Sequence, residues 1–458
     1  MEWMLPEGAA AILRRLNGAG YEAYVVGGCV RDTLLGRTPK DWDVCTSATP
    51  EQMRGALAGL RLVETGLKHG TLTVVIDRTP YEVTTFRVDG GYTDHRHPDG
   101  VTFVTDVRAD LARRDFTVNA MAYHPETGLV DAFGGREDLK AGVIRCVGDP
   151  SERFGEDALR ILRALRFASR YGFAIEPETA RAARALRETL RQVAAERVRV
   201  ELSGILCGKG AEAILREYAD ILSVPLPLIT PMVGFAQRSV HHRYDVWEHT
   251  ARAVGAVAPE EALRLTMLLH DSGKPDSFSV DEKGEGHFYG HAKRSAALAE
   301  EALRALRVDN ATFDRVMTLV SHHDIPIEAE RVLLKRRLSR FGEATLRALI
   351  EVQRADAIAT GMAEEAEVNR RAQALREALD ALVAQSPCVT LRALAIGGGD
   401  LLRLGVPKGP AVGATLQTLL NQVINEETLN EPAALLTAAA EMNGLRLDIH
   451  GIMQKYTK

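Results

Sequence analysis

The periodicity of the apolar residues changes near residue 150, and this change constrains the fold more than any other feature of the sequence. Before it, short runs rich in β-branched residues alternate with turn signals, and we predict strands at 21–26, 41–46, 71–76 and 81–87. The interval Asp77–Pro80 between the last two runs is typical of a hairpin. From Ser151 onward Ala, Leu and Arg dominate in a helical pattern. The pattern therefore predicts an α+β chain, with a mixed α/β head followed by helical modules.

A chain of 458 residues exceeds what one hydrophobic core usually holds, so we expect several packed units. A Pro-rich segment at 224–231 breaks the helical pattern as a domain junction would, and a Gly-rich segment at 397–413 interrupts the last helical region. We predict four domains: a head at 1–150, a helical neck at 151–225, a histidine-rich helical domain at 226–375 and a helical tail at 376–458.

The composition excludes several classes of protein. The first residues lack the basic and apolar regions of a signal peptide, and no run approaches the roughly 20 apolar residues of a membrane span. The five cysteines are odd in number and scattered, which favours reduced, buried thiols. We therefore expect a cytoplasmic protein without a membrane partner.

A basic segment at 160–199 stands out in a chain whose net charge is −5. It contains ten arginines and four glutamates, without Lys or Asp, and so carries a net charge of +6. Such a segment is either a surface for the phosphates of a nucleic acid or a set of solvated helix faces. Charge alone does not choose between these readings.

Gly27 and Gly28 follow the predicted strand 21–26 and open a short helical run that ends at Gly36. Glycines at such a place let the backbone approach a phosphate, and a helix N-terminus favours an anion. A plain tight turn has the same sequence, so the pair alone is a weak signal.

Asp41 and Asp43 lie on the predicted strand 41–46, where residues two apart point to the same side. Two carboxylates on one face repel each other unless a cation lies between them, and Mg²⁺ takes oxygen ligands. Few carboxylates completed by substrate phosphates are typical of two-metal phosphoryl transfer. A solvated strand edge is the alternative for an isolated Asp-x-Asp.

The order of short motifs resembles that of the class II tRNA nucleotidyltransferase and bacterial poly(A) polymerase family. The matching segments span most of the chain: Gly27–Asp32, Asp41–Asp43, Tyr81–Arg87, Arg113–Ala120, Asp131–Leu139, Glu156–Arg160, Glu196–Val198 and Gly399–Pro410. The resemblance implies a polymerase-β-like head that holds Mg²⁺ and joins nucleotides to an RNA 3′-hydroxyl. It implies Mg²⁺ ligands at Asp41 and Asp43, triphosphate contacts at Gly28 and Arg31, and phosphate and ribose contacts at Arg114 and Asp115. Glu82 is either a third carboxylate near the metals or a strand residue facing solvent.

The helix expected to open at Glu156 carries polar residues at steps of three, namely Asp157, Arg160, Arg163 and Arg166. A salt-bridged surface helix would show the same pattern, but the family resemblance implies that Asp157 and Arg160 read the base. A carboxylate only accepts and a guanidinium only donates hydrogen bonds, which suits the amino group and ring nitrogen of cytosine and adenine. Uracil and guanine would leave both groups unpaired, which supports ~10⁴-fold discrimination. Arg163 and Arg166 would then hold the base or the phosphates.

The segment 89–101 corresponds to a mobile segment that the family uses in the switch from C to A addition. Relatives that add only C lack much of it, and here it is full-length. The resemblance therefore implies complete C-C-A addition to tRNA from CTP and ATP.

Eight of the thirteen histidines fall between residues 241 and 323, and their pattern resembles that of HD phosphohydrolases. The minimal ligand set would be His249, His270, Asp271 and Asp356, which suits a divalent transition metal. His291 and His322 would extend the set to two metals, and Lys274 would contact a phosphate. We expect His241, His242 and His287 on the surface or in loops. The domain either hydrolyses phosphoesters, as in RNA end repair, or is a vestige that only packs or supports RNA.

Three alternatives remain at this point. A poly(A) polymerase shares the head, although this chain lacks the strongly basic C-terminal extension typical of those relatives. An HD phosphohydrolase or nucleotide sensor with a ligand-binding head is a second alternative, and a non-catalytic RNA-binding protein is the third. The tail from Gly397 onward would contact the tRNA elbow or a second copy of the chain, so the sequence leaves monomer and homodimer open.

Overall fold

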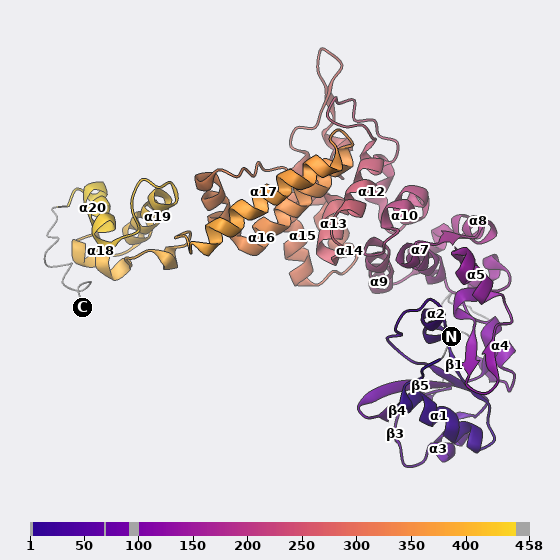
Figure 1. Cartoon of the computed structure of the whole chain (residues 1–458). Coiled ribbons are helices and arrows are strands. Elements are labelled where there is room, and N and C mark those ends of the chain that lie inside the picture. Colours follow the sequence, from indigo (N-terminus) through magenta and orange to yellow (C-terminus); the bar gives the residue numbers. More distant parts are fainter. Residues whose placement is uncertain (1–2, 68–69, 91–99, 446–458) are drawn as a thin grey trace. The chain divides into compact units, whose positions relative to one another are not determined.

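The computed structural model describes residues 3–67, 70–90 and 100–445, and the chain divides into two compact units (Figure 1). The first comprises residues 1–233 with two short segments, 259–261 and 301–309. The second comprises 234–258, 262–300 and 310–458. The first unit's continuous part thus ends just beyond the Pro-rich segment. The finer division into four domains stays a prediction.

A mixed seven-stranded sheet forms the head among the described residues. Its order is β3-β4-β5-β2-β1-β8-β9. The strands are β1 (Ala23–Val26), β2 (Val44–Thr46), β3 (Arg61–Gly66), β4 (Thr71–Ile76), β5 (Thr79–Thr85), β8 (Ala122–His124) and β9 (Gly128–Val130). Strand β2 runs parallel to β5 and antiparallel to β1. The expected mixed sheet with helices is therefore confirmed.

The predicted hairpin is present as β4 and β5, joined by a two-residue turn. Asp77 and Arg78 have left-handed φ values of 49° and 67°, and Ile76 pairs with Thr79. Two positive φ values suit the right-handed twist of the flanking strands. Strand β5 therefore begins two residues earlier than predicted.

Helices and small sheets complete the head. The helices are α1 (Glu7–Gly18), α2 (Gly28–Leu34), α3 (Pro50–Ala56), α4 (Val107–Ala112), α5 (Gly135–Ala141) and the 3₁₀ helix η2 (Thr117–Asn119). Strand β6 (Arg87–Asp89) pairs with β7 (Val101–Phe103), and β10 (Val143–Ile144) pairs with β11 (Ala174–Ile175). A core cluster that includes Val26, Phe86, Leu111 and Ala122 fixes α4 against the sheet. This packing holds the loops before β2 and after β1 in place.

The rest of the first unit is helical, as predicted. It contains α6 (Pro150–Glu156), α7 (Leu159–Tyr171), α8 (Pro177–Ala185), η3 (Arg187–Gln192), α9 (Ala195–Leu206), α10 (Ala211–Glu217), α11 (Ala219–Leu222) and η4 (Pro227–Met232). Helix α7 packs along α9, because Gly204 lets the Arg166 side chain lie against the α9 backbone. Its buried face carries Leu162, Leu165 and Phe167.

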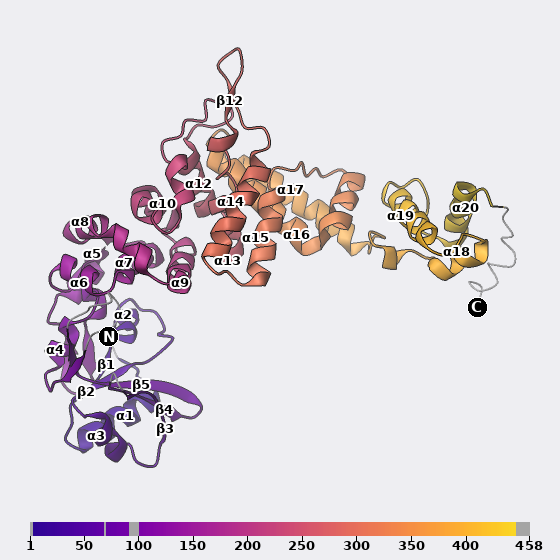
Figure 2. The same ribbon diagram turned by 180° about the vertical axis from the view of Figure 1, so that it is seen from behind.

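The second unit is built from helices and one short hairpin (Figure 2). Its elements are α12 (Val246–Ala256), most of α13 (Glu261–Leu269) and of α14 (His291–Ala305), η5 (Pro275–Ser277), β12 (Ser279–Val280), β13 (Gly286–His287), α15 (Asn310–His322), α16 (Arg331–Thr360), α17 (Glu365–Ala384), η6 (Leu391–Ala393), α18 (Gly398–Leu404), α19 (Pro410–Ile424) and α20 (Pro432–Asn443). Helix α16 packs against α12, α15 and α17. None of the helices in the described part of the chain has the length and apolar character needed to cross a bilayer.

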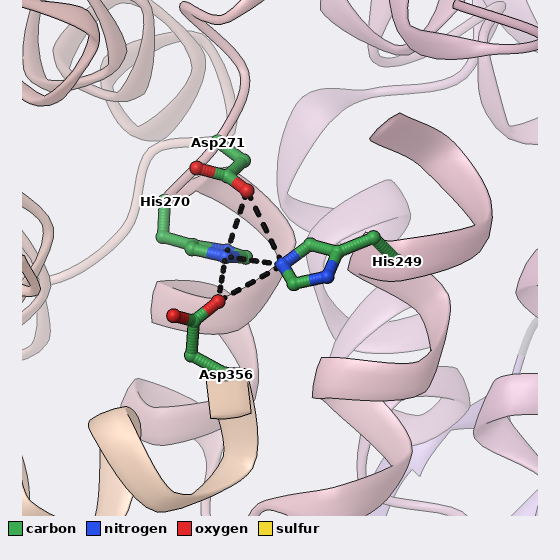
Figure 3. A group of neighbouring side chains, drawn as sticks. All are labelled: His249, His270, Asp271 and Asp356. Carbon is green, nitrogen blue, oxygen red and sulfur yellow. Dashed lines mark hydrogen bonds and ion pairs between the residues drawn. The ribbon is translucent and has the colours of Figure 1, made fainter. Parts of the chain in front are cut away.

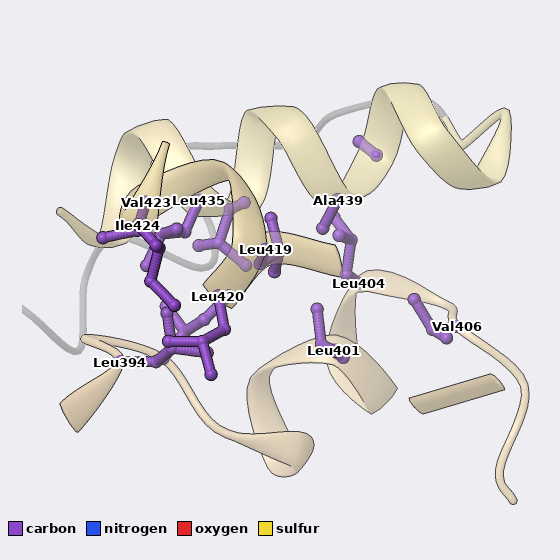
Figure 4. Packing of buried hydrophobic residues seen from close by; sticks show 13 residues of the cluster. Leu394, Leu401, Leu404, Val406, Leu419, Leu420, Val423, Ile424, Leu435 and Ala439 are labelled. Carbon is purple, nitrogen blue, oxygen red and sulfur yellow. The ribbon is translucent and has the colours of Figure 1, made fainter. Parts of the chain in front are cut away.

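The last three helices share a core of their own (Figure 4). Leu401 of α18, Leu419 of α19 and Leu435 of α20 are fully buried in it. Gly405 has a left-handed φ of 103° and ends α18, and Pro410 begins α19 after Gly409. The Gly-rich segment 397–413 therefore comprises α18, the turn that follows it and the first residues of α19.

Candidate active site and metal cluster

Asp41 and Asp43 lie in the loop that leads into β2, not on the strand as predicted, because β2 begins at Val44. The backbone carbonyl of Asp43 still accepts a hydrogen bond from the Val26 N–H at 2.9 Å. Val44 pairs with Val83 in the parallel ladder, so Asp43 lies beside Glu82 of β5. Asp41 and Asp43, in the loop before β2, and Glu82 of β5 thus lie close together at one edge of the sheet.

The electrostatics of Asp43 show that these carboxylates interact. Desolvation by the surrounding protein and the negative charges of Glu82 and Asp41 raise the pKa of Asp43 to about 6, against the positive charge of Arg114. Adjacent carboxylates that disfavour each other's ionisation are what a divalent cation relieves. The donor set of three carboxylates therefore fits Mg²⁺.

The turn after β1 brings Arg114 against the backbone. Gly27 has a left-handed φ of 77°, and a Cβ at this position would lie 2.7 Å from Nη1 of Arg114. Helix α2 begins at Gly28, as the sequence predicts for an anion-binding turn. Arg114 therefore lies between the glycine turn and the aspartates.

Arg31 is more enclosed than a group expected to contact a triphosphate. It is only 5% exposed, donates to Asp32 at 2.9 Å and to Asn119, and lies over the rings of Phe167 and Tyr171. Its Nη2 lies beside Gly28. The guanidinium therefore ties α2 to α7, and its nearest approach to the turn is through Nη2.

A polar cavity of about 320 Å³ lies between the loop after α4 and the start of α7. Its lining consists of Arg113, Arg114, Asp115, Asp157, Leu159, Arg160, Arg163 and Arg197. Five of the six polar side chains predicted around a nucleotide beyond the glycine turn are thus brought together here. The sixth, Arg166, lies outside the lining and forms an ion pair with Glu201 of α9.

Asp157 is not on a helix, in contrast to the prediction. Helix α6 ends at Glu156 and α7 begins at Leu159, with extended backbone at Asp157 (φ −143°, ψ 106°). One carboxylate oxygen of Asp157 accepts from the Leu159 N–H at 3.0 Å, and the other accepts from Nη2 of Arg197 at 2.8 Å. The break turns Asp157 toward the cavity and away from the regular spacing of the arginines that follow.

The arginines of α7 are held by carboxylates. Arg160 donates to Glu156 and to the backbone carbonyl of Arg153. Arg163 donates twice to Oδ2 of Asp115, at 2.9 and 2.6 Å. Burial opposes the ionisation of Asp115, but the charge of Arg163 and the hydrogen bond from Asn119 outweigh it and lower the pKa to about 2. The cavity wall is therefore an ionised and pre-organised network.

Three residues of this network were not predicted as site residues. Arg113 and Arg197 line the cavity, and Asn119 bridges Arg31 and Asp115. Arg113 and Asn119 fall within the motif Arg113–Ala120, and Arg197 falls within Glu196–Val198, so motif membership was the available signal. The segment 89–101, predicted to govern the change from C to A, lies for the most part outside the described residues, at 91–99.

In the second unit, four side chains predicted as metal ligands converge (Figure 3). Nε2 of His249 lies 2.9 Å from Asp356 and 3.2 Å from Asp271, and Nε2 of His270 lies 3.3 Å from each. Nδ1 of His270 donates to the backbone carbonyl of Met267 at 2.7 Å, which orients the ring with Nε2 toward the carboxylates. Two imidazoles and two carboxylates within 4.8 Å fit a divalent transition metal.

Asp271 belongs to a second ligand group through its other oxygen. Oδ1 of Asp271 lies 3.5 Å from His291 and 3.8 Å from His323, whose Nε2 atoms are 3.2 Å apart. The Nδ1 atoms of these two rings contact the carbonyls of Phe288 and Val320. Asp271 thus has the geometry of a carboxylate that bridges two metal positions.

The residue that completes this second group is His323 and not the predicted His322. His322 lies outside both groups, with Nε2 accepting from Arg340 at 3.1 Å and its ring against Phe341. His242, expected on the surface or in a loop, lies in a loop beside the cluster, with its ring 5.4 Å from that of His249. Burial and the charge of Lys274 lower the pKa of His242 to about 4, so this ring is neutral.

The protonation of the four-ligand group shows what a metal would replace. Burial disfavours a charged ring, but Asp271 and Asp356 raise the pKa of His270 to about 10. Burial likewise opposes ionisation of Asp271, yet His270 and Lys274 hold its pKa well below the usual value. Lys274 is buried and donates to Asp271 at 2.7 Å and to Gln237 at 2.9 Å. The carboxylates are therefore ionised and balanced by cations, a role that a bound metal would take over.

Comparisons with known proteins agree with this architecture. Three family models match: the poly A polymerase head domain at residues 23–145, the probable RNA- and SrmB-binding site of polymerase A at 172–221, and a putative domain 2 of tRNA nucleotidyltransferase at 288–439. The CCA-adding enzyme of Levilactobacillus brevis is 36% identical over 444 residues, which cover 95% of this chain and 98% of that protein. The enzyme of Leuconostoc mesenteroides is 50% identical over 207 residues, 45% of this chain and 51% of its own length.

Solved structures show the same fold. The CCA-adding enzyme of Bacillus stearothermophilus in complex with CTP has a TM-score of 0.70 at 30% identity and covers 96% of this chain and 98% of its own. The Thermotoga maritima enzyme complexed with tRNA has a TM-score of 0.57 at 21% identity, over 94% of each chain. With its carboxylate edge, its arginine-lined cavity and relatives that match along nearly its whole length, the chain belongs to the CCA-adding enzymes, the tRNA nucleotidyltransferases.

Proposed function

We propose that this enzyme adds C, C and A to the 3′ end of tRNA at a single nucleotide site built from the edge of the head sheet and the α7 cavity. The observation that carries the proposal is the position of Arg114. This residue lines the cavity, contacts the Gly27 turn and, through its charge, opposes the rise in the pKa of Asp43. A nucleotide bound with its base in the cavity would therefore direct its phosphates toward the aspartates.

The head residues would divide the work as follows. Asp41 and Asp43, with Glu82 beside them, would hold Mg²⁺ ions. When bound, such ions supply a lowered pKa for the RNA 3′-hydroxyl and neutralise the departing pyrophosphate. Gly28 and Arg114 would orient the triphosphate, and Arg31 would fix the turn. In the reaction the 3′-oxygen bonds to the α-phosphorus, the bond to the β-phosphate oxygen breaks, and the hydroxyl proton leaves to solvent.

Base selection would rest on Asp157 and Arg160. The carboxylate would accept from the amino group of cytosine or adenine, and the guanidinium would donate to the ring nitrogen beside it. A carbonyl and a ring N–H, as in uracil and guanine, leave both protein groups buried without partners. The Bacillus stearothermophilus enzyme was solved in complex with CTP, which supports CTP as a substrate of this chain.

The test supplies the purified enzyme with a tRNA that lacks its 3′ end and with each nucleoside triphosphate, singly and mixed. We expect growth by C, C and A followed by arrest. Unlimited A addition would contradict the proposal in favour of a poly(A) polymerase. Asp41→Ala is expected to abolish incorporation, and unaltered incorporation by that variant would refute the role of the carboxylates.

We propose as a second function that the histidine cluster hydrolyses phosphoesters. Six side chains form two ligand groups that share Asp271, and the rings of His270, His291 and His323 each contact a backbone carbonyl through Nδ1. Divalent transition metals bound at these ligands would supply an activated water molecule. The water oxygen bonds to phosphorus, one P–O ester bond breaks, and one water proton passes to the released oxygen.

The hydrolytic function is tested with the metal-loaded enzyme, using Mn²⁺, Ni²⁺ or Co²⁺ separately and 2′,3′-cyclic AMP as substrate. His270→Ala is expected to abolish hydrolysis and to leave CCA addition intact, whereas Asp41→Ala is expected to do the reverse. His322→Ala is a matched control, because this neighbouring histidine lies outside both groups. A wild-type enzyme that hydrolyses nothing with any of the metals would establish the vestigial alternative.

A further inference from the structure

A stacked aromatic pair, half-buried His287 and exposed Tyr289, lies in the segment that leads into the metal cluster. The rings of His287, at the end of β13, and Tyr289 stack with centroids 5.3 Å apart and an interplanar angle of 12°. Tyr289 is 79% exposed. The segment follows the short hairpin that projects from the helical unit (Figure 2). A large ring is therefore presented to solvent on one face while a second ring supports the other face.

The support beneath Tyr289 is fixed. Nε2 of His287 lies 3.1 Å from a carboxylate oxygen of Asp281, and Asp281 also accepts from the backbone N–H groups of Lys283 and Glu285. Phe288 lies between His287 and Tyr289 in the sequence. Its ring packs on Phe278 instead, with centroids 5.5 Å apart. The alternation gives a platform that is organised before any ligand arrives, which lowers the entropic cost of binding.

The same segment positions a metal ligand. His291 follows Tyr289 by two residues, after Gly290 with its left-handed φ of 75°. Nδ1 of His291 contacts the carbonyl of Phe288 at 3.0 Å. The backbone at Phe288, between His287 and Tyr289, therefore also orients the imidazole of His291, which faces Asp271.

The cluster opens to solvent on the side of two of its ligands. The side chain of Asp356 is 36% exposed and that of His291 is 17% exposed, whereas His249, His270, Asp271 and His323 are almost fully buried. A phosphoester can thus approach the cluster at the edge formed by Asp356 and His291. That edge is adjacent in the chain to the Tyr289 platform.

We propose that Tyr289 is the base-binding subsite of the histidine cluster, so that the substrates of this site are nucleotide phosphoesters and not simple phosphoesters. The base would stack on the free face of Tyr289 while the phosphate lies at His291 and Asp356. Stacking on an aromatic side chain tolerates every base, since each base has a π-face. This inference rests on the proposed hydrolytic function, and it adds the substrate class.

The test compares two cyclic phosphates with the same reacting group, 2′,3′-cyclic AMP and glycerol 1,2-cyclic phosphate, which has no base. We expect Tyr289→Ala to lower kcat/KM for the nucleotide roughly tenfold, mainly through KM, since base stacking is worth about 1–3 kcal/mol. Hydrolysis of the glycerol compound is expected to be unchanged. Tyr289→Phe should restore the nucleotide activity, because it keeps the ring.

Val280→Ala is the matched control, since Val280 is an exposed side chain of the same hairpin without a ring. It should leave both substrates unaffected. Equal losses on both substrates in Tyr289→Ala, or no loss on either, would overturn the base-binding subsite. A wild-type enzyme inactive on both substrates would instead overturn the hydrolytic function on which the subsite depends, so the two failures are distinguishable.

Discussion

At the cavity wall, Asp157 is held by a partner forty residues away in the chain. Its two oxygens accept from Leu159 and from Arg197, so the carboxylate is fixed before a base arrives. Carboxylate oxygens accept hydrogen bonds, which is what the amino group of a base requires. The proposed selection between bases would thus depend on Arg197, which need not contact the base itself.

Arg197→Ala is therefore expected to weaken the selection between bases without removing the Asp157 carboxylate. With Asp157 free to rotate, KM for CTP and ATP should rise about tenfold, and the preference over UTP should fall by at least as much. Single-nucleotide incorporation kinetics measure both effects. Arg191→Ala is the control, because Arg191 is an exposed arginine of the same basic segment paired with Glu188. Unchanged discrimination in Arg197→Ala would contradict the positioning role.

Asp115 links the cavity to stability and gives a pH dependence with a definite sign. Its pKa is lowered to about 2 in the folded protein, below the ordinary value of 3.8. The carboxylate therefore contributes stability that is present above pH 4 and lost as the pH falls toward 2. Since one pKa unit corresponds to 1.36 kcal/mol, this contribution is about 2 kcal/mol at pH 7.

Asp115→Asn should accordingly lower the free energy of unfolding by about 2 kcal/mol at pH 7, and by progressively less below pH 4. Urea unfolding followed at pH 7 and pH 3 measures the difference. Glu137→Gln, which removes a fully exposed carboxylate paired with Lys140, should have little effect at either pH. A deficit of Asp115→Asn that stayed constant with pH would contradict the ionic origin.

At the scale of elements, the turn between β1 and α2 sets the distance from the sheet to Arg114. Gly27→Ala meets two obstacles, a left-handed φ and a Cβ 2.7 Å from Nη1 of Arg114. Gly36→Ala meets only the first, because Gly36 has a φ of 68° and open space around its Cβ. Both variants are expected to lose stability from strain, by about 1 kcal/mol in Gly36→Ala and by more in Gly27→Ala, because a ψ of −120° with a positive φ lies outside the left-handed helical region. Only Gly27→Ala should also raise KM for the nucleotides, by about tenfold, in steady-state kinetics.

An equal KM in the two glycine variants would show that the position of Arg114 is not set by this turn. The comparison is sharp because both glycines flank the same helix, α2. A difference in KM tests the displaced guanidinium, because a Cβ at Gly36 has no atom within 4 Å.

The elements that local sequence determines were predictable, and those that depend on distant contacts were not. The hairpin around Asp77 and the glycine turn at Gly27 follow from short-range signals, and both are confirmed. The one Gly near the helix break at Asp157 is Gly155, which lies inside α6, and the Asp157 carboxylate is held across the cavity by Arg197. The regular spacing of the polar residues therefore predicted a helix that included Asp157.

The two adjacent histidines illustrate the same limit at the end of α15. One residue of helix rotates a side chain by about 100°, so only one of His322 and His323 can face Asp271. Which one does so depends on the face that α15 turns toward α16, where Gln353 donates to the carbonyl of His323 at 3.0 Å. The sequence gives both histidines the same local surroundings, and only the packing separates them.

At the scale of the whole molecule, the arginine-lined cavity lies in one unit and the histidine cluster in the other, and the two units are separately compact. We expect two transitions in calorimetric unfolding. CTP with Mg²⁺ should raise one, and Ni²⁺ alone should raise the other, by about 2.7 kcal/mol at a hundredfold excess over Kd, or roughly 5–10 °C. His270→Ala should abolish only the shift with Ni²⁺, and Asp157→Asn only the shift with CTP. A shift of both transitions by either ligand would contradict independent sites, because a ligand stabilises only the unit that binds it.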